Sequence, residues 1–206
     1  MRGGKNEERL YLFDHSLLNV ERTNMPNMSE LVARHEARYH LAAFLARPGM
    51  KVLDFPCGSG YGAKILKDVD YVGMDIDDIT VEYANRFYAG RFYVDDMTDP
   101  KKIGDNQYDL ICCIEGLEHI EMQYQPALIS TFHKALVDGG RLFVSMPEAK
   151  GASGPSKTNP YHLGELSDDD FRGLLTEHFF DVQVYYHEDT LHNGNQAICM
   201  YGICRK

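Results

Sequence analysis

The sequence predicts an α/β fold in which a doubly wound, mostly parallel sheet of seven strands carries helices on both faces and ends in an antiparallel hairpin. Three observations predict this. Short apolar segments alternate with helical segments over residues 51–146, which is typical of a parallel sheet covered on both faces. An apolar strand ending at Asp54 runs into a glycine-rich turn that opens a helix. Two final strand-like segments flank Asn193-Gly194, and Asn-Gly is the strongest short hairpin signal.

The individual elements follow in chain order from the same patterns. Residues 28–46 carry apolar side chains at helical spacing, with Asn27 or Ser29 as a cap and Pro48-Gly49 as a stop. Further helices are expected at residues 60–67, 78–89, 123–137 and 167–178. Strands are expected at residues 51–55, 70–74, 91–94, 108–114, 141–146, 181–187 and 195–203. Residues 95–107 join the third and fourth strands, with room for one helical turn.

The composition favours one soluble domain spanning residues 1–206. No shift in composition divides the chain, and its length suffices for one buried core. No apolar run approaches the roughly 20 residues of a membrane helix, and the N-terminus lacks the apolar core of a signal peptide. Five cysteines, an odd number, fit a reduced cytoplasmic setting. A net charge of −10 without a visible basic cluster opposes nucleic acid as a partner.

The segment Val52–Ala63, which reads V-L-D-F-P-C-G-S-G-Y-G-A, carries the strongest functional signal. Glycines at positions 58, 60 and 62 let the backbone turn sharply and approach a ligand, and the next helix presents unpaired N–H groups. Asp54 stands at the strand's exit. A carboxylate there would repel the pyrophosphate of a dinucleotide, but it suits the ammonium or sulfonium of S-adenosylmethionine. The segment therefore predicts a site for a cationic cofactor.

Four segments together resemble a class I S-adenosylmethionine-dependent methyltransferase with a Rossmann-like fold: Val52–Ala63, V-G-M-D-I-D, F-Y-V-D-D-M and Y-D-L-I-C-C-I-E-G-L-E-H-I. All four fall at carboxyl ends of predicted parallel strands, where open α/β sheets bind ligands. The resemblance implies that Asp54 and the turn surround the methionine part of the donor, that Asp75 binds the ribose, and that Asp96 flanks the adenine. The predicted cofactor-binding residues are Asp54, Phe55, Pro56, Cys57, Gly58, Ser59, Gly60, Asp75, Ile76, Asp96, Met97, Ile114 and Glu115.

Two other interpretations of this region stay open. Gly58, Gly60 and Ala63 also satisfy the dinucleotide pattern G-x-G-x-x-A, so an NAD(P)-dependent oxidoreductase of Rossmann type is an alternative. Asp54 and the terminal hairpin argue against it. A non-catalytic S-adenosylmethionine-binding module is the other alternative. Asp75 could also cap the following helix, and we interpret Asp95 as a solvated turn residue.

The segment E-x-x-E-H, from Glu115 to His119, predicts the chemical site. If it opens a helix, Glu115, Glu118 and His119 share one face, and His162 occupies another carboxyl-end position. Three interpretations stay open. Glu115, Glu118, His119 and His162 could bind a divalent cation such as Mg²⁺, His119 with Glu118 could act as a metal-free general base, or the acids could be structural. The segment resembles that of methyltransferases acting on hydroxyl groups, in which it ligates a metal.

The acceptor is expected to be a hydroxyl, because a hydroxyl is a poor nucleophile that a base or a metal would activate. Glu21–Pro26, His35–Tyr39 and Asn159–His162 resemble a bacterial subgroup that modifies cell-surface glycans or sugars. We therefore expect a small molecule, a sugar or a glycan precursor. Residues 1–47 would cover substrate and cofactor, and residues 147–165 would form a mobile loop. Candidate acceptor contacts are Arg22, His35, Tyr39, Tyr124 and Tyr161. The sequence predicts no oligomeric state.

Overall fold

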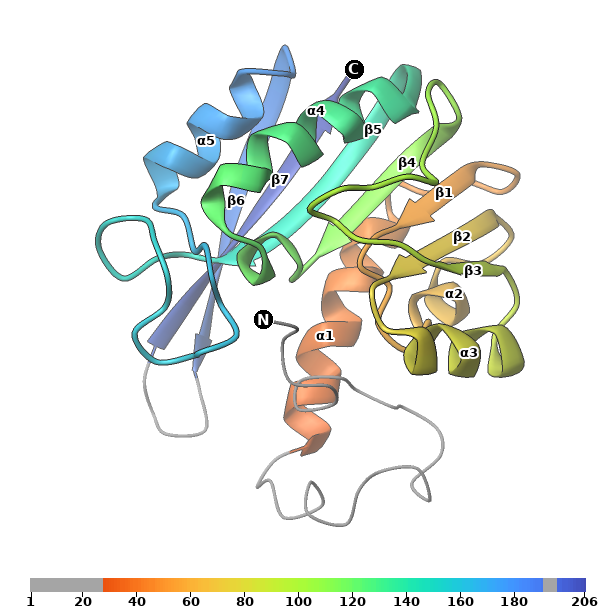
Figure 1. The fold of residues 1–206 in the computed structure, drawn as a ribbon, viewed down its shortest axis with the longest axis horizontal. Helices are drawn as coiled ribbons and strands as arrows, with labels where there is room; N and C mark the ends of the chain where they lie inside the picture. Colours follow the sequence, from red (N-terminus) through yellow and green to blue (C-terminus); the bar gives the residue numbers. More distant parts are fainter. Residues whose placement is uncertain (1–27, 191–195) are drawn as a thin grey trace.

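The structure, a computed structural model, describes residues 28–190 and 196–206 (Figure 1). Its strands are β1 (Lys51–Asp54), β2 (Asp70–Asp75), β3 (Arg91–Val94), β4 (Tyr108–Ile114), β5 (Leu136–Pro147), β6 (Asp181–Thr190) and β7 (Gln196–Arg205). Its helices are α1 (Met28–Ala43), α2 (Gly62–Ile65), α3 (Asp78–Phe87), α4 (Gln125–Ala135) and α5 (Asp168–Thr176), with 3₁₀ turns η2 (Leu117–His119) and η3 (Met122–Tyr124). The predictions for Glu21–Pro26 and for the Asn193-Gly194 turn lie outside the described residues.

The sheet has seven strands in the order β3-β2-β1-β4-β5-β7-β6, which confirms the predicted fold. β1 pairs in parallel with both β2 and β4. The chain therefore adds β2 and β3 on one side of β1 and then crosses back to add β4 and the later strands on the other side. The carboxyl ends of β1 and β4 therefore form the switch point at which such sheets bind ligands. β7 lies antiparallel between β5 and β6, which confirms the antiparallel pair at the end of the sheet.

Helices pack on both faces of the sheet (Figure 1), and a cluster of buried side chains lies on each face. Neighbouring residues on a strand point to opposite faces, and accordingly Val52 and Leu53 belong to different clusters. Leu53 lies in the cluster that includes Phe132 of α4 and Phe171 of α5. Val52 lies in the cluster that includes Tyr39 of α1, together with residues of α3. The functional edge of the sheet is thus held between two layers of helices.

The observed elements differ from the predicted ones at several boundaries: α1 and α2 are shorter than expected, and β6 runs to Thr190 instead of residue 187. β5 begins at Leu136 instead of residue 141, because the chain leaves α4 directly into pairing with β4, with a register shift at Tyr108. Residues 95–107 contain no helical turn. The short 3₁₀ turns η2 and η3 were not predicted, and η2 contains the second acid and the histidine of the E-x-x-E-H segment.

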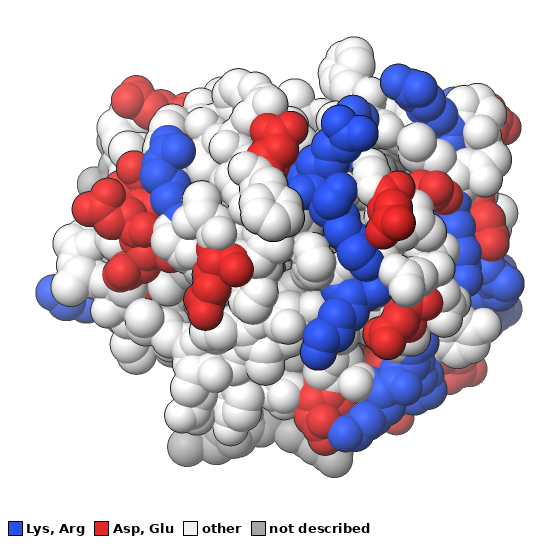
Figure 2. All heavy atoms as spheres, turned by 90° about the horizontal axis from the view of Figure 1, so that it is seen from above, with Lys and Arg blue, Asp and Glu red and all other residues white. Residues whose placement is uncertain are grey.

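Figure 2 shows a face on which Lys and Arg side chains gather in a band bordered by acidic residues. The expectation that no basic cluster forms was drawn from the linear sequence, in which these residues are scattered. Pairing of strands brings distant cations together, as where Arg141 of β5 lies directly opposite Arg205 of β7. The prediction that nucleic acid is not a partner stays a prediction. Among the described helices, none is both long enough and apolar enough to cross a membrane.

Candidate active site

Asp54 ends β1 as a fully buried carboxylate. Its Oδ2 atom accepts hydrogen bonds from the hydroxyl of Tyr39 on α1, at 2.8 Å, and from the hydroxyl of Tyr71 on β2. Its Oδ1 atom is buried and has no hydrogen-bond partner among the described residues. Burial raises the pKa of the Asp54 carboxyl to about 7, although the two tyrosine hydroxyls act in the opposite direction. A buried acceptor without a donor is costly, so a cationic ligand that reached this oxygen would be bound favourably.

The glycines of the turn after β1 have different roles. Gly58 and Gly60 both have positive φ, at +53° and +85°. A Cβ on Gly60 would lie 2.6 Å from the Cβ of Ala84 on α3, and a Cβ on Gly62 would lie 2.3 Å from the ring of Tyr39, so both positions serve packing. A Cβ on Gly58 would meet nothing within 4 Å. The backbone at Gly58 is therefore the part of the turn that is open to a ligand.

The other residues predicted from the turn contribute packing and shape. Phe55 is buried in the core and faces the ring of Phe132 edge-on. Pro56 lies under Gly116, where a Cβ would come within 2.2 Å of the proline ring. The backbone N–H of Cys57 donates to the carbonyl of Met74 at 2.8 Å. Ser59 is also buried. If Phe55 and Cys57 contact the predicted cofactor, they would therefore do so through backbone atoms.

Asp75, at the end of β2, joins the glycine turn to the start of α3. Its Oδ2 atom accepts the N–H of Gly58 and its Oδ1 atom accepts the N–H of Asp77, both at 3.0 Å. Asp77 is the N-cap of α3, with its own carboxylate accepting the N–H of Ile79. The helix-cap alternative for Asp75 is therefore wrong, because its neighbour caps the helix. Next to it, Ile76 is 56% exposed at the same edge of the sheet.

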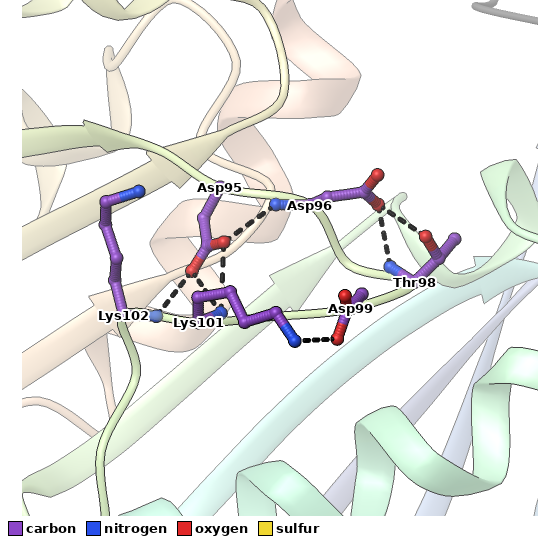
Figure 3. Close-up of polar contacts among 6 residues, drawn as sticks. All are labelled: Asp95, Asp96, Thr98, Asp99, Lys101 and Lys102. Atoms are coloured by element: carbon purple, nitrogen blue, oxygen red, sulfur yellow. Dashed lines mark hydrogen bonds and ion pairs between the residues drawn. The ribbon is translucent and has the colours of Figure 1, made fainter.

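The loop after β3 is organised by Asp95 (Figure 3). Its buried carboxylate accepts N–H groups from Asp96, Lys101 and Lys102 at 2.8 to 3.1 Å. The interpretation of Asp95 as a solvated turn residue is therefore wrong. Asp96 bonds locally, since its Oδ1 atom accepts both the N–H and the hydroxyl of Thr98. Because the N–H of Asp95 also donates to the carbonyl of Asp75, the loop is fixed beside β2.

Glu115 follows Ile114, the buried last residue of β4, and has a left-handed φ of +48°. Its Oε1 atom lies 3.2 Å from Nε of Arg38 and 2.9 Å from the hydroxyl of Ser145. The thiol of Cys199 also contacts this atom, at 3.3 Å. Burial would raise the pKa of Glu115, but the guanidinium of Arg38 and the neighbouring donors hold it below its usual range. Glu115 thus links β4 to α1, β5 and β7.

Glu118, His119 and His162 form a compact cluster in which one ligand atom from each lies within 4.8 Å of the others. Glu118 is buried and the two histidines are half-buried. Glu115 is not a member of this cluster. The expectation that positions 115, 118 and 119 share one helical face is wrong, because only residues 117–119 form a 3₁₀ turn and Glu115 precedes it in a left-handed conformation.

Both imidazoles of the cluster are held through their Nδ1 atoms. Nδ1 of His119 lies 3.1 Å from the carbonyl oxygen of Tyr161, and Nδ1 of His162 lies 2.7 Å from Oε1 of Glu165. The two rings meet edge to face with centroids 5.1 Å apart. A carbonyl oxygen can only accept, so Nδ1 of His119 carries the hydrogen. In neutral His119 the lone pair is then on Nε2, the atom that can accept a proton or bind a cation.

The segment that brings His162 to the cluster is docked on η2. The carbonyl oxygen of Glu118 accepts the N–H groups of Leu163 at 2.7 Å and Gly164 at 3.0 Å. The buried side chain of Gln125 donates to the carbonyls of both Leu117 and Gly164. Gln125 and Glu165 were not predicted as site residues, since a single glutamine or glutamate carries no motif. Whether residues 147–165 move stays a prediction.

A family model described as a methyltransferase domain matches residues 28–196. The chain belongs to this methyltransferase family. A probable S-adenosylmethionine-dependent methyltransferase of Mycolicibacterium smegmatis is 31% identical over 181 residues, which are 84% of this chain and 67% of that protein. Phosphoethanolamine N-methyltransferase 3 of Arabidopsis thaliana is 36% identical over 107 residues, but these are only 21% of that protein.

Solved structures of methyltransferases share the fold. A S-adenosylmethionine-dependent methyltransferase from Archaeoglobus fulgidus matches with a TM-score of 0.69 at 16% identity, over 86% of this chain and 94% of that one. Phosphoethanolamine N-methyltransferase 2 of Haemonchus contortus, solved with S-adenosylmethionine, matches with a TM-score of 0.64 at 15% identity, over 80% of this chain and 51% of that one. S-adenosylmethionine is therefore the cofactor of this methyltransferase, in agreement with the sequence prediction and against the nicotinamide alternative.

Proposed function

We propose that this methyltransferase transfers the methyl group of S-adenosylmethionine to a hydroxyl oxygen of a small molecule, sugar or glycan precursor. The observation that carries the proposal is the cluster of Glu118, His119 and His162. It lies just beyond the carboxyl end of β4, beside the strand that ends in Asp54. A proton acceptor at this place serves a hydroxyl, whose nucleophilicity depends on losing its proton.

The donor would lie across the carboxyl ends of β1 and β2. The ammonium of its methionine part would bind the buried Oδ1 atom of Asp54, which has no partner among the described residues. Gly58 offers open backbone beside it. Asp75 would receive the ribose hydroxyls, and the exposed Ile76 would lie against the adenine. Asp96 and Met97, on the loop that Asp95 organises, would border the other side of the adenine.

The transfer is an in-line displacement at the methyl carbon. The acceptor oxygen forms a bond to this carbon while the carbon–sulfur bond breaks, and sulfur keeps the electron pair, so that S-adenosylhomocysteine leaves as a neutral thioether. The proton of the acceptor hydroxyl passes to Nε2 of His119, whose orientation is held by the carbonyl of Tyr161. Positioning contributes much of the rate in such a reaction, and a placed base typically adds about 10² to 10⁴-fold.

The cluster also has the composition of a divalent-cation site. One carboxylate and two imidazoles provide three ligand atoms within 4.8 Å of one another, and each imidazole is oriented by an acceptor at Nδ1. Two imidazoles suit a transition metal such as Mn²⁺ or Fe²⁺ better than Mg²⁺, which prefers oxygen ligands. We therefore propose that Glu118, His119 and His162 would hold such a cation, without Glu115. When bound, the cation would occupy Nε2 of His119, so it would replace His119 as the activating group and would do so by lowering the pKa of the acceptor hydroxyl.

Methyl transfer from labelled S-adenosylmethionine to a panel of hydroxylated and amino acceptors tests the proposal. His119→Ala should lower turnover by about 10² to 10⁴-fold while leaving the affinity for S-adenosylhomocysteine near that of the wild type. His133→Ala is the matched control, because His133 lies on α4 and packs against Phe179. Unchanged turnover of His119→Ala would remove its assigned role, and label found only on nitrogen would overturn the hydroxyl acceptor.

A further inference from the structure

Glu165 contacts His162 through the Nδ1 atom of the imidazole. Its Oε1 atom is 2.7 Å from Nδ1 of His162. The side chains are only 16% and 13% exposed, so water competes little for either group. The short distance and the shielding mark a charge-assisted hydrogen bond.

The backbone around Glu165 is fixed independently of this contact. Glu165 forms an antiparallel bridge with Gly154, in which each N–H donates to the other's carbonyl at 2.9 Å. The next residue, Leu166, bridges to Glu148 at the end of β5 and accepts the N–H of Ala149. Backbone hydrogen bonds on both sides of the segment therefore fix the position of the Glu165 carboxylate.

A carboxylate next to Nδ1 determines where a neutral imidazole carries its hydrogen. Ionised Glu165 can only accept a hydrogen bond, so Nδ1 of His162 must carry the hydrogen, which leaves the lone pair on Nε2. Histidines that bind metals or accept protons commonly have such a partner, and its loss typically weakens metal binding by about 10- to 100-fold. In His119 the carbonyl of Tyr161 has the same role.

We propose that Glu165 is a positioning residue of the active site, which holds His162 in the Nδ1–H form so that Nε2 is available to the cluster with Glu118 and His119. This role for Glu165 deepens the proposed function and rests on it, because it matters only if His162 belongs to the active site. The tautomer and orientation of the His162 ring can be measured whether or not that function holds. The proposal assigns Glu165 no contact with donor or acceptor, because it acts through His162.

The tautomer is measured directly in the protein without donor, acceptor or metal. Long-range ¹H–¹⁵N correlation spectra of histidine-labelled protein, recorded at a pH where imidazoles are neutral, assign the nitrogen that carries the hydrogen. We expect the Nδ1–H form for His162 in the wild type. Glu165→Ala should move His162 toward the Nε2–H form, and Glu165→Gln, whose amide can either accept from or donate to Nδ1, should no longer hold the ring fully in the Nδ1–H form.

Binding of Mn²⁺, measured by calorimetry and by electron paramagnetic resonance, gives the second readout. Glu165→Ala should weaken Mn²⁺ binding by about 10- to 100-fold, and Glu165→Gln should weaken it less. Glu121→Ala is the matched control, since Glu121 is an exposed acid just after η2 whose side chain contacts Gln123. It should leave both the tautomer and the affinity unchanged.

The outcomes separate this inference from the proposed function. If folded Glu165→Ala keeps His162 in the Nδ1–H form, the positioning role is overturned, whatever the activity. If Glu165→Ala does not fold, an Nε2–H form of His162 in the wild type would equally overturn it. Failure of the wild type to bind Mn²⁺ would overturn the cation in the proposed function, while the tautomer would still decide the role of Glu165. Absence of methyl transfer would overturn the proposed function alone.

Discussion

Donor affinity should fall as the pH is lowered from 8 to 6, because in the proposed site the donor's ammonium binds Asp54 in its ionised form. The folded-state pKa of this carboxyl is raised to about 7 by burial. Since only the ionised fraction binds, the apparent Kd is multiplied by about 11 at pH 6 and about 1.1 at pH 8, so affinity should weaken roughly 10-fold. Near pH 7, binding should release about half a proton.

Asp54 is the group around this pocket that should titrate in that range. The facing groups are Tyr39 from α1, Tyr61 from the glycine turn, Tyr71 and Asp75 from β2, and Cys112 from β4. Burial raises the pKa values of the three tyrosines and of Cys112, so these groups stay neutral between pH 6 and 8. An α-amino group of ordinary pKa, about 7.7 to 8.0, is partly uncharged at pH 8, so titration of the ligand reduces the expected difference between pH 6 and pH 8 to about 3- to 5-fold.

Tyr71→Phe sharpens this test because it removes one of the two hydroxyls that stabilise ionised Asp54. A hydrogen bond to a charged group worth about 1.5 kcal/mol corresponds to about one pKa unit. Raising the pKa from about 7 to about 8 makes donor binding at pH 7 roughly 5-fold weaker. Tyr108→Phe is the control, since Tyr108 is also buried but begins β4 at the other end of the sheet.

The assay is calorimetric titration with S-adenosylhomocysteine at pH 6, 7 and 8, in buffers of different ionisation enthalpy that report proton release. Asp54→Asn should bind weakly and without this pH dependence. Equal wild-type affinity at pH 6 and pH 8 would refute the reasoning, as would a pH dependence that persists in Asp54→Asn.

The raised pKa of Asp54 also predicts how the stability of the protein changes with pH. The ligand-free fold should lose stability as the pH rises from about 4 to about 7, and Asp54→Asn should raise the Tm at pH 8.

Further predictions concern the packing of the site. Gly58→Ala should lower the free energy of unfolding by about 1 kcal/mol, because Gly58 has a left-handed backbone, and it should weaken donor binding. Gly60→Ala also brings a Cβ to 2.6 Å from the Cβ of Ala84 and should therefore lower the Tm much further. Melting curves and donor titrations compare the two, and equal Tm losses would contradict the assignment. Gln125→Ala leaves two carbonyls without their donor and should lower the free energy of unfolding in urea by about 2 to 4 kcal/mol. Arg38→Met leaves buried Glu115 without its cation and should lower the free energy of unfolding by about 3 kcal/mol. The double variant with Glu115→Gln should recover part of this loss. If the double variant recovers none of it, the ion pair does not account for the loss.

The fold was predictable because each layer repeats a simple pattern in the sequence. The period of two in strands and the helical spacing between them placed β1 to β4 within a residue or two. β5 was predicted too short, because Asp138-Gly139-Gly140 is typical of a turn. The structure includes these residues in β5, where Leu136 already pairs with Tyr108 before the register shifts. Irregular pairing of this kind depends on the neighbouring strand and leaves no local signal.

The site was predictable where strand ends carry acids, and less so where contacts cross the fold. Asp54 and Asp75 could be placed at one edge because parallel strands end together. The hydroxyl donors of Asp54 come from Tyr39 and Tyr71, which in sequence have the pattern of ordinary core residues. Glu115 has a left-handed backbone, which glutamate rarely adopts, so its separation from His119 could not be predicted from its own residue type.

α1 joins the two carboxylates of the switch point through consecutive residues. Arg38 pairs with Glu115 after β4, and Tyr39 donates to Asp54 at the end of β1. The two strands are adjacent in the sheet, so one turn of helix spans the place where the donor's methionine part would lie. A displacement of α1 would leave Glu115 without its cation and Asp54 with one hydroxyl donor fewer. The docking of α1 is therefore thermodynamically coupled to the ionisation of Asp54, and a ligand that favours ionised Asp54 should also favour the docked helix.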